Sequence, residues 1–189
     1  MVARPAHKRA TYEDVLAAPA HQVAEVLNGV LHTHPRPRLR HARASSILGE
    51  ELGPAFGRGR GGPGGWLILD EPELHLGSEP DILVPDLAGW RRTRMPEMPD
   101  EPYATLAPDW VCEVLSESTE AVDRSEKLPI YAREKVEHAW LVDPVIKTLE
   151  VLRLAGDGWR IVGTWSGDAR ERAEPFDAIE LELGALWMR

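Results

Sequence analysis

The alternation of apolar and polar positions predicts a chain built mainly of short strands, with helices between them. The segments QVAEVL and VLHTH flank Asn28-Gly29, two residues that tolerate the positive φ of a two-residue hairpin turn. Thr11 and Asp14 precede VLAA and predict a short helix before this hairpin. After an extended connector, HPRPRLR, apolar residues recur at roughly helical spacing over residues 39–56, which predicts a longer helix.

The rest of the chain predicts further strands and one more helix. A helix capped by Ser118 or Thr119 runs to about Lys135, and the proline-rich residues 91–102 form a surface loop. Strands are predicted over residues 66–69, 74–76, 82–87, 110–115 and 139–142, and then in TLEVLRL, WRIVGTW and IELELGALW. Hairpins interspersed with helices indicate an α/β or α+β sheet domain, and no internal repeat is visible.

The length and the cysteine content limit the class of protein. A chain of 189 residues suits a single domain over residues 1–189, which could bury roughly 70% of its unfolded surface. The single cysteine, Cys112, excludes an internal disulfide and a cysteine-rich zinc site, and it fits a reducing cytoplasm. No apolar run reaches the length of about 18 residues that indicates a membrane span. The N-terminal stretch lacks the apolar core of a secretory signal. We therefore expect a cytoplasmic protein with no membrane partner.

The net charge of −9 argues at first against a nucleic-acid partner, because neutralisation of phosphates dominates such binding. The distribution of charge changes this picture. Residues 1–70 hold nine Lys and Arg against six Asp and Glu, a net charge of +3, whereas the remainder has a net charge of −12. A basic face could therefore coexist with an acidic site whose carboxylates are neutralised by metal. A protein with no polyanionic partner fits the charge equally well.

Two acidic residues and one lysine have the spacing that metal-dependent phosphodiester cleavage needs. Asp86 ends the strand-like segment EPDILVPD, Glu113 lies within APDWVCEVL, and Lys127 lies in the helical run AVDRSEKLPIYA. Two carboxylates can hold a hard divalent cation such as Mg²⁺ through oxygen. The cation acidifies a bound water and polarises the phosphate, and the lysine can stabilise or position the nucleophile.

Each of these residues also has a plainer interpretation. Asp86 could simply end a strand and cap a turn, and Lys127 could be a solvated helix residue paired with Asp123 at i,i+4. Glu113 is flanked by apolar residues, and a carboxylate on a buried strand is costly unless it is paired or bound to metal. Two other chemistries have less support. GRGRGGPGG lacks the Gly-Lys-Ser/Thr of a nucleotide P-loop, and the seven histidines show no metal-ligand spacing.

Four segments, taken in order, resemble the bacterial putative restriction-endonuclease family within the PD-(D/E)XK phosphodiesterase superfamily. They are AEVLNGVL, VPDL, APDWVCEVLSEST and DRSEKLPIYAREKVEHAWLVDP, which together cover roughly residues 12–183. The resemblance implies a restriction-endonuclease-like core, a mixed sheet flanked by helices, with metal-binding carboxylates at one end of the central strands. It places Asp86 at the motif aspartate and Glu113 at the acidic position of the second motif.

The chain departs from the superfamily pattern at one position. Leu115 stands where a lysine would complete the usual Glu-x-Lys. In the family this lysine lies on the following helix instead, and the resemblance therefore maps it onto Lys127. Glu25 falls where the family has an acidic residue that can complete the metal shell, and its alternative is a cross-strand surface charge. Basic residues after the motif strand could grip phosphates or be solvated: Arg91, Arg92 and Arg94.

From these observations we expect a Mg²⁺-dependent endonuclease that hydrolyses DNA phosphodiester bonds, with Mn²⁺ able to substitute. Asp86, Glu113 and Glu25 would bind the metal, and Lys127 would stabilise or orient the attacking water. The resemblance also implies a homodimer, since restriction-like folds often pair to cut two strands. One alternative is a module that kept the fold, lost turnover, and acts in nucleic-acid binding or protein assembly. Another is hydrolysis of a different phosphodiester.

Overall fold

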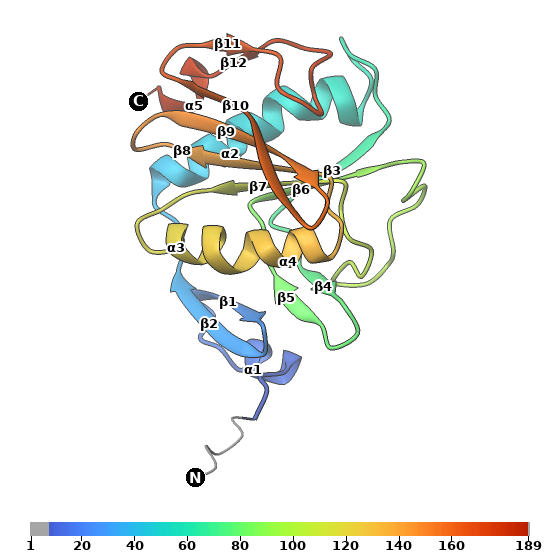
Figure 1. Cartoon of the computed structure of the whole chain (residues 1–189), viewed down its shortest axis with the longest axis vertical. Coiled ribbons are helices and arrows are strands. Elements are labelled where there is room, and N and C mark those ends of the chain that lie inside the picture. The colour runs from blue at the N-terminus through green and yellow to red at the C-terminus, as the bar shows by residue number, and fades with distance from the viewer. Residues whose placement is uncertain (1–7, 189) are drawn as a thin grey trace.

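The computed structural model describes residues 8–188 of the chain (Figure 1). Its helical elements are α1 (Tyr12–Leu16), α2 (Leu39–Leu52), the π-helical turn η1 (Gly53–Gly57), α3 (Glu120–Val122), the π-helical turn η2 (Asp123–Lys127), α4 (Leu128–Arg133) and α5 (Gly184–Trp187). Its first strands are β1 (Gln22–Leu27), β2 (Val30–Pro35), β3 (Trp66–Asp70), β4 (Leu74–Leu76), β5 (Asp81–Leu83) and β6 (Leu87–Arg91). Then come β7 (Trp110–Val114), β8 (His138–Asp143), β9 (Thr148–Ala155), β10 (Gly158–Ser166), β11 (Arg170–Glu171) and β12 (Leu181–Glu182).

The strands form two main sheets. A four-stranded sheet has the order β2-β1-β5-β4, a six-stranded sheet has the order β10-β9-β8-β7-β6-β3, and β11 pairs with β12. The pair β7–β8 is parallel, whereas the other strand pairs are antiparallel. A parallel pair needs a crossover connection, and the helical segment from α3 to α4 supplies it. The result is a mixed sheet in the centre of the molecule.

Helices cover both faces of the six-stranded sheet (Figure 1). On one face, α2 and α5 pack over a core that contains Trp66, Trp110 and Trp140. On the other face, α4 packs over a second core, in which Tyr131 is fully buried. The longest helix of residues 8–188 is α2, with 14 residues, and no helix in this range is long and apolar enough to cross a membrane.

Several sequence predictions about these elements are confirmed. The first hairpin turns at Asn28 and Gly29, which have φ of 52° and 80°, as its two-residue turn requires. The hairpin of β9 and β10 and the buried strand β7 are also present. Residues 91–102 form no helix, and β6 alone reaches into this range, at Arg91.

Three predictions about element boundaries are wrong. Residues 82–87 do not form one strand, because β5 and β6 belong to different sheets and residues 84–86 link them. The helix before β8 is not continuous, since η2 interrupts it. Pro129 explains this break: it has no N–H to bond the carbonyl of Ser125, and its ring disfavours a regular turn there. The last predicted strand shortens to β12 and continues as α5.

Candidate active site

The candidate site lies where the two sheets meet. The link from β5 to β6 contains Pro85, which cannot donate to a strand ladder, and it ends at Asp86. The ladder of β6 and β7 has the pair Leu87 and Cys112, so the next step of the same antiparallel register sets Asp86 beside Glu113. The structure therefore sets these two residues side by side, Glu113 from β7 and Asp86 from the link that precedes β6.

Glu113 takes the place of a core residue on β7. Its neighbours at two residues' distance, Val111 and Leu115, pack into the core beneath α4, and Glu113 points to the same side. There Tyr131 donates its hydroxyl to Oε1 of Glu113 at 2.6 Å, and Lys127 donates to Oε2 at 3.1 Å. Both partners come from one helical segment. Tyr131 follows Lys127 by four residues, and residues four apart lie on the same face of a helix.

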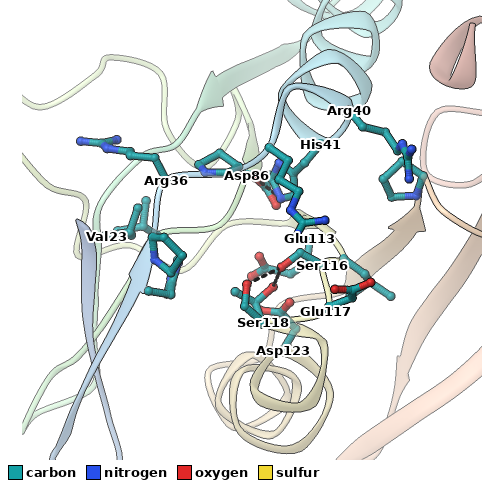
Figure 2. A pocket seen from close by; sticks show the side chains of 18 of the residues that line it. Val23, Arg36, Arg40, His41, Asp86, Glu113, Ser116, Glu117, Ser118 and Asp123 are labelled. Carbon is teal, nitrogen blue, oxygen red and sulfur yellow. Dashed lines mark hydrogen bonds and ion pairs between the residues drawn. The ribbon is translucent and has the colours of Figure 1, made fainter. Parts of the chain in front are cut away.

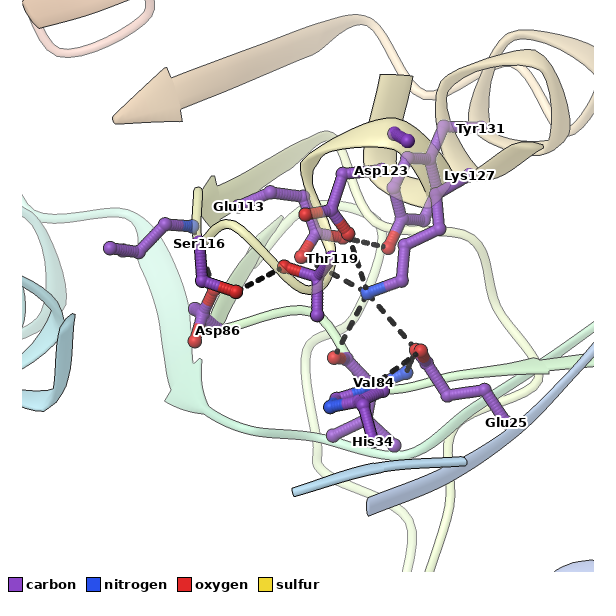
Figure 3. A network of polar contacts seen from close by, with 12 residues as sticks. Glu25, His34, Val84, Asp86, Glu113, Ser116, Thr119, Asp123, Lys127 and Tyr131 are labelled. Carbon is purple, nitrogen blue, oxygen red and sulfur yellow. Dashed lines mark hydrogen bonds and ion pairs between the residues drawn. The ribbon is translucent and has the colours of Figure 1, made fainter. Parts of the chain in front are cut away.

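Lys127 joins three carboxylates into one buried group, which we call the acid–lysine cluster: Glu25, Glu113, Asp123 and Lys127 (Figure 3). The Nζ atom of Lys127 lies 3.0 Å from Oε1 of Glu25 and 3.4 Å from Oδ1 of Asp123. The side chain of Lys127 is 4% exposed and that of Glu113 is 3% exposed. The alternative of a solvated lysine paired only with Asp123 is therefore wrong, although that ion pair is present.

Glu25 lies on the far side of the cluster from Asp86. Its Oε1 accepts the backbone N–H of Val84 at 2.7 Å, and its Oε2 lies 3.3 Å from Nε2 of His34. The alternative of a cross-strand surface charge is wrong, because the side chain is 1% exposed. These contacts orient the carboxylate of Glu25 towards Lys127. The role of Glu25 as a metal ligand stays a prediction.

Asp86 is held from two directions. Its Oδ2 accepts the backbone N–H of Val114 at 2.7 Å, and its Oδ1 lies 3.3 Å from Nε2 of His41 (Figure 2). The pKa of His41 is raised, because the hydrogen bonding and charge of Asp86 outweigh the lowering effect of burial. With side chains 13% and 12% exposed, Asp86 and His41 are more accessible than the acid–lysine cluster.

Burial and the charge of Lys127 act in opposite directions on the carboxylates of the acid–lysine cluster. Burial raises the pKa of Glu113 well above its usual value, the charge of Lys127 opposes this shift, and nearby carboxylates reinforce it. Burial also acts to raise the pKa of Glu25, but the charge of Lys127 and the hydrogen bonds to Glu25 outweigh burial, so the pKa of Glu25 is lowered. The pKa of Lys127 is raised well above its usual value, because the surrounding carboxylates outweigh its burial.

This arrangement predicts a pH dependence of stability. Because the folded-state pKa of Glu113 lies above its usual value of 4.5, its contribution to stability is complete below that value. The contribution is lost as the pH rises through the raised folded-state pKa. We expect the free energy of unfolding of metal-free protein to fall over that range by up to about 1.4 kcal/mol per pH unit more than in Glu113→Gln. Urea denaturation of both proteins in chelator, from about pH 5 to about pH 9, measures this difference. Parallel curves would contradict it.

A pocket of about 420 Å³ opens above the cluster (Figure 2). Its floor includes Asp86, Glu113 and Lys127, and one wall carries hydroxyl groups from residues 116–119. The other wall is the connector before α2, which sequence reasoning treated only as an extended link. That connector and the first turn of α2 bring three arginines and His41 to the pocket: Arg36, Arg38 and Arg40.

The arginines predicted to grip phosphates lie elsewhere. Arg91 stacks over the ring of Trp66 at 4.6 Å, and Arg94 pairs with the buried Asp109 at 3.0 Å. Arg91, Arg92 and Arg94 are absent from the lining of the pocket. Arg91 is the last residue of β6, about 16 Å along the strand from Asp86, and Arg92 and Arg94 follow it. The candidate site does not include these three arginines, and their role in binding nucleic acid stays a prediction.

The side chains at the pocket floor fit a hard divalent cation. Among residues 8–188 no group of three or more His, Cys, Asp or Glu side chains is arranged to hold a metal. Mg²⁺ does not need such a group, since it is usually bound by one or two carboxylates together with water and substrate phosphates. Asp86 and Glu113 supply two carboxylates. Burial and the neighbouring carboxylates raise the pKa of Glu113, and a bound cation would act with Lys127 against that rise.

A comparison with solved structures finds the same architecture in another protein. A solved structure described as a putative nuclease belonging to DUF820, from Anabaena variabilis, matches with a TM-score of 0.75 at 20% sequence identity. The match covers 94% of this chain and 97% of the other. It confirms the predicted mixed α+β fold, and at this identity it shows the fold alone.

The family is established independently of that structure. A family model, Uma2, described as "putative restriction endonuclease", matches residues 10–184. The chain therefore belongs to the Uma2 family, and the resemblance drawn from its four segments is confirmed. No curated protein matches the chain.

Proposed function

We propose that this protein is a metal-dependent endonuclease that hydrolyses DNA phosphodiester bonds, with Mg²⁺ as its cofactor and Mn²⁺ as a substitute. The observation that carries the proposal is the 3.1 Å contact between Lys127 and Glu113. The Glu-x-Lys pair that β7 lacks is thereby assembled in space from β7 and the following helical segment. Membership of the restriction-endonuclease family and the nuclease-like fold support the same conclusion.

In the proposed mechanism each residue has a distinct task. Asp86 and Glu113 would hold the cation, which when bound polarises the scissile phosphate and acidifies a coordinated water. Lys127 would stabilise the negative charge that develops on the phosphate or orient the nucleophile. Tyr131 fixes Glu113 by its hydrogen bond at 2.6 Å, and His41 restrains Asp86 from the helix side.

The second candidate is an inactive module that binds nucleic acid or assembles with proteins. One observation favours it: both carboxylate oxygens of Glu113 are already contacted, by Tyr131 and Lys127. A cation would have to share Glu113 with these donors. Incubation of wild-type protein with single- and double-stranded DNA in Mg²⁺, Mn²⁺ or chelator separates the two proposals. Metal-dependent products support the nuclease, and binding without products under all conditions supports the module.

Metal should also stabilise the fold, because only the native site brings Asp86 and Glu113 together. At a metal concentration of about 100 times the Kd, the gain is about 2.7 kcal/mol. We expect the melting temperature to rise on addition of Mg²⁺ or Mn²⁺, and this rise to disappear in Asp86→Asn. Thermal unfolding with and without chelator measures the effect. A melting temperature unmoved by either ion would contradict a working metal site.

We propose further that the chain acts as a homodimer in the cytoplasm. The pairing rests on the family resemblance, and the edge strand β10, where Ile161 is 57% exposed, offers a contact surface. The compartment rests on the single cysteine, Cys112, which is buried and unpaired. Sedimentation should give about twice the chain mass of 21.1 kDa at micromolar concentration. A species of one chain mass would contradict the dimer.

A further inference from the structure

The reactive groups lie at the bottom of the pocket rather than on an open face. The side chains of Glu113 and Lys127 are 3% and 4% exposed, and Asp86, nearer the mouth, is 13% exposed. A phosphodiester bond can meet these groups only by entering the pocket, because the outer surface presents little of them.

The size of the pocket restricts what can enter. Its volume of about 420 Å³ lies in the range of small-molecule sites, which is about 300–1,000 Å³. A nucleotide-sized group fits such a space. Duplex DNA carries its phosphates on a stiff rod with a persistence length of about 150 base pairs, and folding one phosphate into a recess would deform it. An unpaired strand bends freely and has no such cost.

The basic wall of the pocket suits the backbone of such a strand. Residues 34–43 contain four arginines and no acidic residue, in a chain whose net charge is −9. Arg36, Arg38 and Arg40 are exposed and line the pocket, and Figure 2 shows Arg36 and Arg40 on either side of Asp86. Within the described residues, only Arg36 of these three has a carboxylate within 4.0 Å, that of Glu71 at 3.9 Å. The other two guanidinium groups remain available to phosphates.

The pocket offers little for reading bases. No Phe, Tyr or Trp among residues 8–188 lines it. Proteins that hold single strands through their bases use aromatic stacking, worth about 1–3 kcal/mol per base. Recognition here would therefore depend on backbone charge and tolerate different sequences.

From these observations we infer that the pocket takes an unpaired DNA strand, held by its phosphates on Arg36, Arg38 and Arg40, in preference to an intact duplex. The choice of DNA as the ligand rests on the proposed nuclease function. The inference specifies the form of the substrate, which family membership leaves open.

The test measures binding without cleavage. Wild-type protein in chelator is titrated into one labelled oligonucleotide, either single-stranded or annealed to its complement in a blunt duplex, over a series of salt concentrations. We expect the single strand to bind at least about tenfold more tightly. In Arg38→Glu/Arg40→Glu, the affinity for the single strand should fall at least about tenfold. The slope of log K against log salt, which is negative, should become less steep by about 1.4, because two phosphate contacts are lost. Both residues lie at the start of α2, where acidic residues favour a helix, so the fold should survive.

The matched control is Arg58→Glu/Arg60→Glu, which makes the same change of charge in an exposed loop at the opposite end of α2. It should leave the salt slope unchanged. The inference is overturned if the duplex binds as tightly as the single strand, if both double variants lose affinity equally, or if the single strand does not bind at low salt. Cleavage by wild-type protein is assayed separately with Mn²⁺. If the protein cleaves DNA but does not prefer the single strand in the binding assay, this inference alone is wrong. If it prefers the single strand but cleaves no DNA, the nuclease proposal alone is wrong.

Discussion

Glu113→Gln should abolish metal-dependent DNA cleavage, with a fall in rate of at least about 10³-fold. Glutamine keeps the volume of the side chain and can still accept a hydrogen bond from Tyr131. It removes the negative charge that would hold the cation beside Asp86. Lys127 retains Glu25 and Asp123 as partners, so the cluster loses one carboxylate and keeps its cation paired. The fold should therefore persist while the chemistry is lost.

The assay is single-turnover cleavage of single- and double-stranded DNA with Mn²⁺, together with circular dichroism to establish folding. Glu137→Gln is the matched control, since it makes the same chemical change at an exposed position outside the pocket. This control should cut at the wild-type rate. If wild-type protein takes up Mn²⁺ but cuts no DNA, and Glu113→Gln binds DNA more tightly, the inactive module is the better description. In that case the only effect of the Glu113 carboxylate on DNA is to repel its phosphates.

Local signals in the sequence account for the parts of the fold that were predicted well. The turn at Asn28-Gly29 depends on two residues that accept positive φ, and the strand around Glu113 depends on its own apolar run. The break at residues 84–86 had one local signal, Pro85, which cannot donate to a strand ladder but does not show that the two halves join different sheets. The run from Ile82 to Leu87 is largely apolar, and its division between two sheets depends on pairing with β1 and β7, which lie far away in sequence.

The site shows the same division between local and long-range information. A carboxylate in an apolar strand marked Glu113, and the family resemblance mapped the motif lysine onto Lys127. His41, Tyr131 and the pocket-lining arginines were missed as site residues, because each has an ordinary role for its position in the sequence. Tyr131 follows Lys127 by four residues, and this spacing was the one signal that could have found it. For His41 only the packing of α2 against the sheet brings its ring to Asp86.

Lys127→Met should destabilise the metal-free protein by about 3–5 kcal/mol at neutral pH. The variant keeps an apolar chain of similar length but leaves Glu25, Glu113 and Asp123 buried with no cation among them. Their mutual repulsion and burial would then raise all three folded-state pKa values above those of the unfolded chain. Stability of the variant should therefore recover as the pH falls towards the unfolded pKa values and be lost as the pH rises.

Two further measurements separate this electrostatic cause from a packing defect. The double variant Lys127→Met/Glu113→Gln should be more stable than Lys127→Met alone, because one buried charge is removed with the lysine. Mg²⁺ should raise the melting temperature of Lys127→Met, as we expect it to raise that of wild-type protein, while cleavage stays about 10²–10³-fold below the wild-type rate. Lys135→Met is the control, since Lys135 is 60% exposed and pairs with the exposed Asp157, a kind of contact worth about 0–1 kcal/mol. Equal destabilisation by Lys127→Met at about pH 5 and about pH 8 would show that lost packing, not unpaired charge, is the cause.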